Sequence, residues 1–369
     1  MWRYLLIIIL LSSSGCVSTA RFLQHGFPDQ QDYVFQKADT IYPNDLKFSF
    51  NFTQGSHSDF VDSKKVNNRH QETLQTVLPK SNVVALMVIK NDSIIYEYYK
   101  PNYTINTTYT SFSLAKSFVA TLIGIAIDEK KIKNIDESII NYIPELASKK
   151  GFEKLTFRCL LEHRSGLNYR DYALKKNAGL INLFYGKDIT KVLSTLKIKQ
   201  IPCTNYKYQN VNTLLLGIAL ERATKKRLPH YFQEKLWQKI GTQNTVMWSK
   251  DDNDNIKSYC CLQGKILDFA KFGRLYLNKG IYNAEQVVSK SWVDLATNPD
   301  RNNPNQYPLH FQCSGAWSPQ TFNARGMYDQ FILVNPKNKV IILQFCDQSL
   351  KPPLIFWRNI YESLSEELP

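Results

Sequence analysis

The chain has 369 residues, of which 43% are hydrophobic, 13% aromatic and 21% charged. This composition is typical of a globular protein and excludes a disordered chain, and the length allows two or three domains. Lys and Arg number 46 against 32 Asp and Glu, a formal net charge of +14. The positive residues are dispersed in short pairs and are not interleaved with aromatic residues on one element. We therefore expect a solvated surface and no nucleic-acid partner.

The N-terminus is typical of an export signal. Arg3 precedes the apolar run 5–11, which is too short to span a bilayer as a stable anchor. The sequence offers two alternative cleavage sites. Gly15-Cys16 resembles a bacterial lipoprotein site, where a lipid on Cys16 would anchor the chain to a membrane, and Ser18-Thr19-Ala20 suits ordinary secretion. We favour the lipoprotein; either way we expect residues 1–20, the signal, to lie outside the fold of a protein of the bacterial periplasm or envelope membrane.

Residues 21–80 are polar, with few regular apolar periods, and predict an extended N-terminal arm with a helical patch near 68–77. A β-hairpin follows. Its two strands, 83–90 and 93–99, are rich in β-branched and aromatic residues and flank an Asn91-Asp92 turn. A polar loop over 102–110 leads out of the hairpin.

Ser113 and Lys116 stand where the next apolar helix begins. Their spacing places them one turn apart on one helix face, and the start of a helix leaves backbone N–H groups free. An amine within reach can take the serine proton, and the N–H groups can hold an oxyanion. The alternative is a Ser N-cap followed by a Lys on an ordinary amphipathic helix.

From 117 to 255 the periodicity is mainly helical. Thr156 is a candidate N-cap, and Pro144 and Gly166 are candidate helix ends. The predicted helices cover residues 136–144, 155–163, 212–223 and 231–240.

Tyr208-x-Asn210 lies on a loop just before one of these helices. The phenol could exchange protons with a leaving group if a nearby ammonium lowered its pKa, and the amide could orient a substrate amide. The alternative is an Asn N-cap beside a surface Tyr.

Besides Cys16 there are six cysteines, and in an exported chain they permit disulfides whose pairing the sequence cannot choose. The adjacent pair Cys260-Cys261 suits neither a bridge between strands nor a metal knuckle, and buried small apolar residues are the alternative for several of the six. No cysteine pair has zinc-ligand spacing, so we expect no metal and no cofactor. The six are Cys159, Cys203, Cys260, Cys261, Cys313 and Cys346.

The end of the chain turns from helices to strands and closes on a helix. Helices are predicted over 268–277 and 291–297, strands over 314–318, 330–334 and 340–345, and a last helix over 353–364. If the late strands pair with the early hairpin, one antiparallel sheet is split by a helical insertion. The predicted fold class is α+β: an antiparallel β-sheet flanked by helices, from residues 81–116 and 256–369, with an all-helical domain inserted over 117–255.

Together the motifs resemble the serine hydrolases of the β-lactamase and penicillin-binding superfamily, for which Ser-x-x-Lys is a signature. The resemblance is closest to the class C-like branch, which includes carboxylesterases, D-aminopeptidases and 6-aminohexanoate-dimer hydrolases. It covers roughly residues 80–365. The matching stretches are 113–118, 160–167, 208–210, 260–262 and 268–275.

The resemblance implies that Ser113 is the acylated nucleophile and Lys116 its proton acceptor. Lys116 must then be partly neutral near pH 7, which a desolvated cleft or a neighbouring cation could achieve. Tyr208 would relay the proton to the leaving group, and Asn210 would contact the substrate. The oxyanion would be held by the backbone N–H of Ser113 and one N–H from a strand at the sheet edge. His163 falls in a stretch that is mostly structural in the family and is given no chemical role.

The superfamily's third motif, Lys-Thr-Gly, has no clean match here. By order along the chain the nearest candidate is Arg325-Gly326, where Gly326 would let a substrate approach the strand and Arg325 would supply the missing positive charge. Loss of Lys-Thr-Gly is shared by esterase and amide-hydrolase members and makes an efficient β-lactamase less expected.

The prediction is an exported serine hydrolase that cleaves an ester or amide in a small or peptide-like molecule through an acyl-enzyme. One alternative keeps the chemistry and changes the substrate, to a D-Ala-D-Ala carboxypeptidase or a weak β-lactamase. Another is a catalytically silent envelope protein that uses the same fold for binding.

Overall fold

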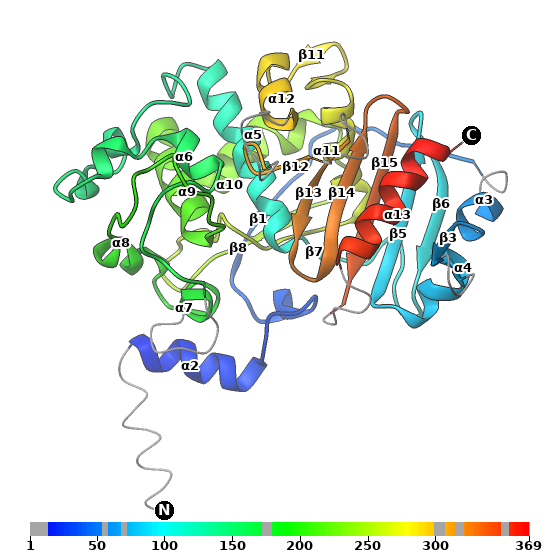
Figure 1. Ribbon diagram of the computed structural model, residues 1–369, viewed down its shortest axis with the longest axis horizontal. Coiled ribbons are helices and arrows are strands. Elements are labelled where there is room, and N and C mark those ends of the chain that lie inside the picture. Colours follow the sequence, from blue (N-terminus) through cyan, green and yellow to red (C-terminus); the bar gives the residue numbers. More distant parts are fainter. Residues whose placement is uncertain are drawn as a thin grey trace, which may run out of the picture.

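A mixed seven-stranded sheet forms one side of the molecule in the computed structural model (Figure 1). The structure describes residues 14–53, 58–67, 72–171, 179–298, 307–313, 321–347 and 354–368. The strand order is β12-β13-β14-β15-β5-β6-β2, and every pair is antiparallel except β2 with β6. The bounds are β12 Gln312–Cys313, β13 Phe322–Gly326, β14 Gln330–Asn335, β15 Val340–Cys346, β5 Val83–Lys90, β6 Ser93–Tyr99 and β2 Asn51–Phe52.

The pairing of β15 with β5 joins the end of the chain to the early hairpin. Val340 lies opposite Lys90 and Leu343 opposite Met87. The predicted hairpin strands match β5 and β6 residue for residue, with Asn91 and Asp92 at positive φ in the turn. The sheet is therefore split by the intervening chain, as predicted. The expected strand at 314–318 lies outside the described residues.

Helices cover both faces of this sheet. On β14, Ile332 belongs to the core beside α11 (Ile266–Leu277), and the alternate residue Leu333 belongs to the core beside α13 (Leu354–Glu367). Alternate side chains of a strand point to opposite faces, so the two helices sandwich the sheet (Figure 1). A Cβ on Gly273 of α11 would lie 2.9 Å from Ile332, so this glycine lets the helix approach the strands closely.

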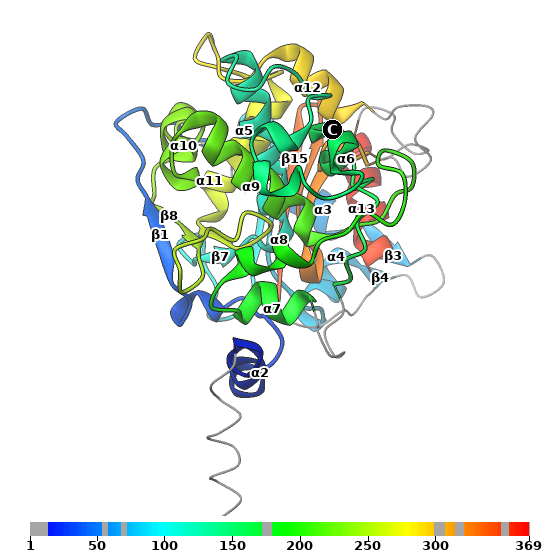
Figure 2. The same ribbon diagram turned by 90° about the vertical axis from the view of Figure 1, so that its left-hand side faces the viewer.

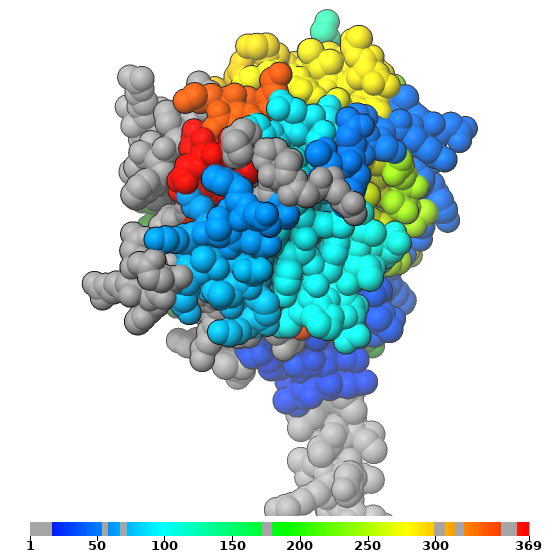
Figure 3. Space-filling model, turned by 90° about the vertical axis from the view of Figure 1, so that its right-hand side faces the viewer, coloured from blue at the N-terminus to red at the C-terminus, as the bar shows by residue number. Residues whose placement is uncertain are grey.

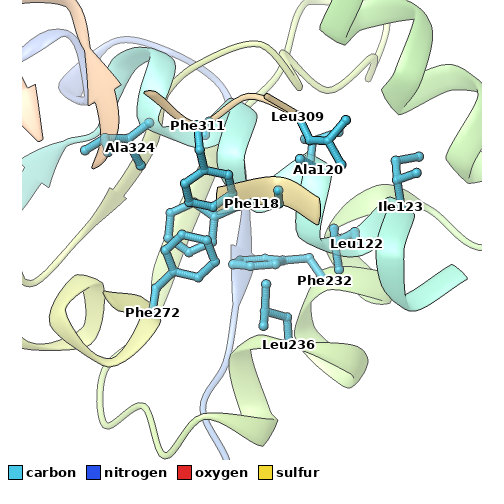
Figure 4. Close-up of a cluster of buried hydrophobic side chains, with 14 of the residues drawn as sticks. Phe118, Ala120, Leu122, Ile123, Phe232, Leu236, Phe272, Leu309, Phe311 and Ala324 are labelled. Carbon is cyan, nitrogen blue, oxygen red and sulfur yellow. The ribbon is translucent and has the colours of Figure 1, made fainter. Parts of the chain in front are cut away.

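Helix α5 (Ala115–Asp128) follows the Ser113 turn and runs through the main core. The ring of Phe118 stacks on Phe272 of α11 at 3.9 Å and meets Phe232 of α10 (Leu228–Lys235) edge-on at 5.8 Å (Figure 4). Because α5 is mostly apolar and almost all of its residues are buried, its first turn is held firmly between the sheet and the inserted helices.

The helical insertion follows α5, with some differences from the prediction. Thr156 caps α6 by accepting a hydrogen bond from Cys159 N, as predicted. The segment 136–144 forms the short 3₁₀ turns Ile139–Asn141 and Pro144–Leu146 instead of an α-helix, because the residue before a proline is disfavoured in the α conformation. The other helices are α6 Phe157–Leu161, α7 Gly179–Tyr185, α8 Val192–Thr195, α9 Asn210–Thr224 and α12 Lys290–Thr297.

A second sheet, of order β1-β8-β9-β7, was not predicted. Its strand β1 comes from the N-terminal arm and β8 from the segment predicted to be all-helical (Figure 2). Strands this short carry no readable period, and their pairing is decided by partners far away in the chain. The bounds are β1 Ala38–Ile41, β8 Val246–Ser249, β9 Leu262–Gly264 and β7 Tyr109–Thr110; β10 Ile281–Tyr282 and β11 Glu285–Gln286 form a separate ribbon.

The N-terminal arm is more ordered than an extended segment, and its later part lies on the outside of β6 (Figure 3). Helix α2 (Ser14–His25) lies against α7, where Ser18 Oγ donates to Asn182 Oδ1 at 2.7 Å. This contact differs from the expectation that residues up to 20 lie outside the fold; residues 5–11 are outside the described part. Of the patch at 68–77, only 74–77 is described as helix. The remaining arm elements are α3 Ser58–Asp62, β3 Lys65–Asn67, β4 Glu72–Thr73 and α4 Leu74–Val77.

The cysteines form two disulfides. Cys159 is bonded to Cys203, and the adjacent residues Cys260 and Cys261 are bonded to each other. The sequence left the pairing of the cysteines open, and the bond between these neighbours is not a bridge between two strands. Cys313 and Cys346 are buried thiols, in agreement with the interpretation of several cysteines as buried small apolar residues.

Candidate active site

Ser113 and Lys116 meet at the entrance of α5. Ser113 lies in the 3₁₀ turn Phe112–Leu114 that leads into the helix and is partly exposed, whereas Lys116 in the first helical turn is 1% exposed. Lys116 Nζ lies 3.0 Å from Ser113 Oγ. The predicted pair is thus in direct contact, with the serine partly exposed and the lysine buried.

The Lys116 amine is held by two further acceptors: Asn210 Oδ1 at 2.7 Å and the Tyr259 carbonyl at 2.6 Å. Burial disfavours the ammonium and lowers the pKa of Lys116 from 10.5 to about 7, although the negative charge of Asp171 opposes this shift. At neutral pH a large fraction of Lys116 is therefore the free amine, which is the form able to accept a proton.

Tyr208 lies just before α9 and beside Ser113 and Lys116. Its ring centre lies 5.1 Å from Lys116 Nζ, and 39% of the residue is exposed. Burial of the hydroxyl raises the pKa of Tyr208, which a hydrogen bond with Ser113 and the charge of Arg325 only partly offset. The idea that an ammonium lowers this pKa is wrong: Tyr208 stays a neutral phenol, able to donate one proton and accept another.

Asn210 is the first residue of α9 and faces the lysine. Its side-chain oxygen accepts from Lys116, and its backbone N–H donates to Asp171 Oδ2 at 2.8 Å. The structure thus gives Asn210 contacts with Lys116 and Asp171, while contact with a substrate stays a prediction.

Asp171 was not predicted from the sequence. Burial raises its pKa, and its second oxygen, Oδ1, is buried without a hydrogen-bond partner. Its nearest functional neighbours, Lys116 and Asn210, are about forty residues or more away in the chain. No local spacing marks such a residue, and only the approach of α9 to the loop before residue 172 reveals it.

A buried polar layer lies beneath Tyr208. The His163 ring centre is 4.4 Å from that of Tyr208 and 4.6 Å from that of His310, and His163 Nδ1 pairs with Asn212 Nδ2 at 2.9 Å. Burial holds the pKa of both histidines well below 6.5, so both are neutral. Because neither histidine carries a charge near pH 7, this layer acts on Tyr208 by packing against its ring, which agrees with a structural role for His163.

Strand β13 brings Arg325 and Gly326 beside the serine turn. A Cβ on Gly326 would lie 2.4 Å from the Ser111 carbonyl oxygen, so only glycine allows this approach. The Arg325 guanidinium donates to Gln312 Oε1, and its charge acts on the pKa of Tyr208. Asp329, just after the strand, has its pKa raised by burial to about 6, against the opposing charge of Arg325. Gly326 therefore lies against the serine turn and the charge of Arg325 acts on Tyr208, while substrate binding by either residue stays a prediction.

Within the described ranges, no cluster of His, Cys, Asp or Glu has the arrangement of a metal site. Among those same residues no helix is long and apolar enough to cross a membrane.

Comparison with known proteins agrees with this fold and site. The model of the family described as Beta-lactamase matches residues 78–353, so the chain belongs to that family and to its class of β-lactamase-fold serine hydrolases. A 6-aminohexanoate-dimer hydrolase of Paenarthrobacter ureafaciens is 24% identical over 232 residues, 60% of this chain and 58% of that protein. The match thus spans less than two thirds of that relative's own length.

Two solved structures show the same fold. A putative 6-aminohexanoate-dimer hydrolase from Bacillus anthracis superposes with a TM-score of 0.83 at 22% identity, over 92% of this chain and 94% of its own. A class C beta-lactamase superposes with a TM-score of 0.62 at 15% identity, over 86% of this chain and 99% of its own. The chain is thus similar to both, with closer likeness in shape to the first.

Proposed function

We propose that this protein cleaves an ester or amide bond through an acyl-enzyme on Ser113, with Lys116 as base and Tyr208 as proton relay. The observation that carries the proposal is the contact, at 3.0 Å, between the hydroxyl of a partly exposed serine and a buried amine, whose pKa of about 7 allows it to accept a proton. A serine is a weak nucleophile until an adjacent base removes its proton, and this geometry supplies that base.

Each step uses a group already in place. The Lys116 amine takes the hydroxyl proton as Ser113 Oγ bonds to the substrate carbonyl carbon. The backbone N–H of Ser113 and one from the neighbouring end of β13 would hold the oxyanion. The neutral Tyr208 hydroxyl, hydrogen-bonded to Ser113, gives its proton to the leaving alcohol or amine as the scissile bond breaks and takes back the proton that the Lys116 ammonium carries, so both groups return to their starting forms. Water then releases the acyl group by the reverse proton path.

The charge of Arg325 supports the alternative of a cell-wall substrate, a D-Ala-D-Ala peptide or a β-lactam. Its positive charge beside Tyr208 would favour a substrate that ends in a carboxylate, as D-Ala-D-Ala peptides and penicillins do. A substrate with a free carboxylate, whether a cell-wall peptide or a linear amide of an amino acid, therefore suits the site better than a neutral lipid ester.

Export is part of the proposal. Cleavage before Cys16 would keep the bonds of Ser18 to Asn182 and of Arg21 to Asp252, whereas cleavage after Ala20 would remove Ser18. These contacts support the lipoprotein reading. Incorporation of labelled palmitate into the wild type and its loss in Cys16→Ser is the expected result; labelling of both variants, or of neither, would contradict lipid attachment at Cys16.

Intact-mass spectrometry tests the chemistry, with p-nitrophenyl acetate, 6-aminohexanoate dimer and a penicillin as probes. We expect ester or amide turnover by the wild type and none by Ser113→Ala. A stable penicilloyl adduct on Ser113 would favour cell-wall chemistry. Neither adduct nor turnover with any probe would contradict the proposal and favour the silent binder.

A further inference from the structure

The disulfide between the neighbouring residues Cys260 and Cys261 lies directly behind the catalytic group. Both residues are buried, at 7% and 1% exposure, and their Cα atoms are 3.7 Å apart. A bond between neighbours closes almost no loop, so it contributes little to stability through chain entropy. Its effect must be local: it ties the two side chains into a small covalent ring and restricts the backbone between them.

The backbone of this pair holds the serine turn to the second sheet. Cys261 N donates to the carbonyl of Phe112, the residue just before Ser113, at 3.2 Å, and the Cys261 carbonyl accepts from Ser249 N of β8 at 3.1 Å. Trp248 Nε1 donates to the Cys260 carbonyl at 3.0 Å. The pair therefore helps to hold the turn to the second sheet, together with the two hydrogen bonds between Ser111 and Leu262.

The residue immediately before the pair, Tyr259, gives its carbonyl to Lys116. This is the shortest of the three hydrogen bonds of Nζ, at 2.6 Å against 2.7 Å to Asn210 and 3.0 Å to Ser113. Tyr259 is itself anchored, because its hydroxyl donates to the Leu183 carbonyl at 2.6 Å. The direction of the carbonyl depends on the peptide that follows it, which belongs to Cys260.

Cys261 has a φ of +71°, a left-handed conformation that side chains other than glycine rarely adopt. Phe112, across the hydrogen bond, also has a positive φ, of +45°. Two unfavourable backbone conformations thus face each other next to the nucleophile. Without a constraint, either could relax and turn the 259–261 backbone away from the lysine.

We propose that the Cys260–Cys261 disulfide is a positioning element for the proton transfer, because it holds the Tyr259 carbonyl against the Lys116 amine and the serine turn against β8. The inference rests on the proposed function of Ser113 and Lys116. It adds a covalent clamp, outside the Ser-x-x-Lys and Tyr-x-Asn motifs, on which the geometry of the base depends.

The proposal predicts a particular change in the pH profile. The ammonium donates to all three partners, whereas the neutral amine donates to Asn210 and Tyr259 and accepts from the Ser113 hydroxyl; the partial negative charge of the Tyr259 carbonyl oxygen stabilises the ammonium more than the neutral amine. Loss of the Tyr259 carbonyl should therefore lower the pKa of Lys116 and move the acidic limb of kcat/KM to lower pH. The plateau of kcat/KM should fall at the same time, because the amine is no longer aimed at Ser113 Oγ.

The experiment compares three variants with the wild type, using p-nitrophenyl acetate from pH 5 to 9. Cys260→Ser/Cys261→Ser opens the ring with nearly the same side-chain volume. Cys260→Gly/Cys261→Gly opens it but tolerates the left-handed backbone. Cys159→Ser/Cys203→Ser is the matched control that loses the other disulfide. Non-reducing peptide mapping first establishes that Cys260 and Cys261 are bonded in the purified wild type, and thermal unfolding checks that each variant folds.

We expect a fall of about tenfold or more in the plateau of kcat/KM, with a lower-pH limb, in both the Ser–Ser and the Gly–Gly variants. The control variant should keep the wild-type limb. A wild-type plateau and acidic limb in the Gly–Gly variant would overturn the proposal, because the left-handed backbone at residue 261 would then suffice without the disulfide. Free thiols at Cys260 and Cys261 in the wild type would also overturn it. If the proposed function itself fails, the wild type shows no Ser113-dependent turnover, which is a separate result.

Discussion

The acidic limb of the pH–rate profile should report the pKa of Lys116. A lysine with its ordinary pKa of 10.5 would be neutral in roughly one molecule in 3,000 at pH 7, whereas a pKa of about 7 makes about half of the molecules competent. Burial alone thus raises the active fraction at pH 7 by roughly a thousandfold. We expect kcat/KM for p-nitrophenyl acetate to be level above about pH 8 and to fall about tenfold per pH unit below about pH 6.

Two variants assign that limb. Asp171→Asn removes the charge that raises the pKa of Lys116, so its limb should move to lower pH. Asp329→Asn removes a carboxyl that titrates at about pH 6 and should leave the limb in place. His163 and His310 are held neutral and should not contribute. A limb centred above about pH 9, or one that moves with Asp329 and not with Asp171, would refute Lys116 as the base.

The same pKa also makes stability depend on pH. Lys116 binds fewer protons folded than unfolded between about pH 7 and 10.5, so its contribution to the free energy of unfolding rises with pH over that range. Relative to Lys116→Met, the wild type should therefore gain stability as the pH rises from 7 to 10. Urea unfolding at several pH values measures this difference, and a constant difference would contradict the depressed pKa.

Three further outcomes are expected. Tyr208→Phe should lower kcat by about 10²–10⁴ with little effect on KM, because it removes the proton relay and keeps the ring; an unchanged kcat would exclude the relay. Cys159→Ala/Cys203→Ala should lower the free energy of unfolding by about 4 kcal/mol, since the bond closes a loop with a sequence separation of 44, and equal urea midpoints for reduced and oxidised protein would contradict this. Gly124→Ala should cost about 1–3 kcal/mol because its Cβ would lie 2.4 Å from the Trp292 ring, and a rise in stability from better helix propensity would show that the ring moves aside.

The sequence by itself determined the elements whose signal is local. Alternation and an Asn-Asp turn predicted β5 and β6 to the residue, and a Thr before an apolar period predicted the N-cap of α6. The contact of Ser113 with Lys116 followed from helix geometry alone, because residues three apart on a helix share a face. Of the late strands, β14 and β15 were predicted because each is an apolar run, whereas β12 and β13 were not predicted.

Only the tertiary structure decided what depends on distant parts of the chain. The second sheet is made of strands too short to carry a period, and Asp171 joins the site because α9 lies against its loop. The role of Asn210 as a partner of Lys116 and the raised pKa of Tyr208 both come from burial, which no spacing encodes. The sequence left the pairing of the six cysteines open, and only the tertiary structure shows that Cys260 is bonded to Cys261. Local sequence thus specifies which groups can react, and the packing of distant segments decides which of them are charged and where they point.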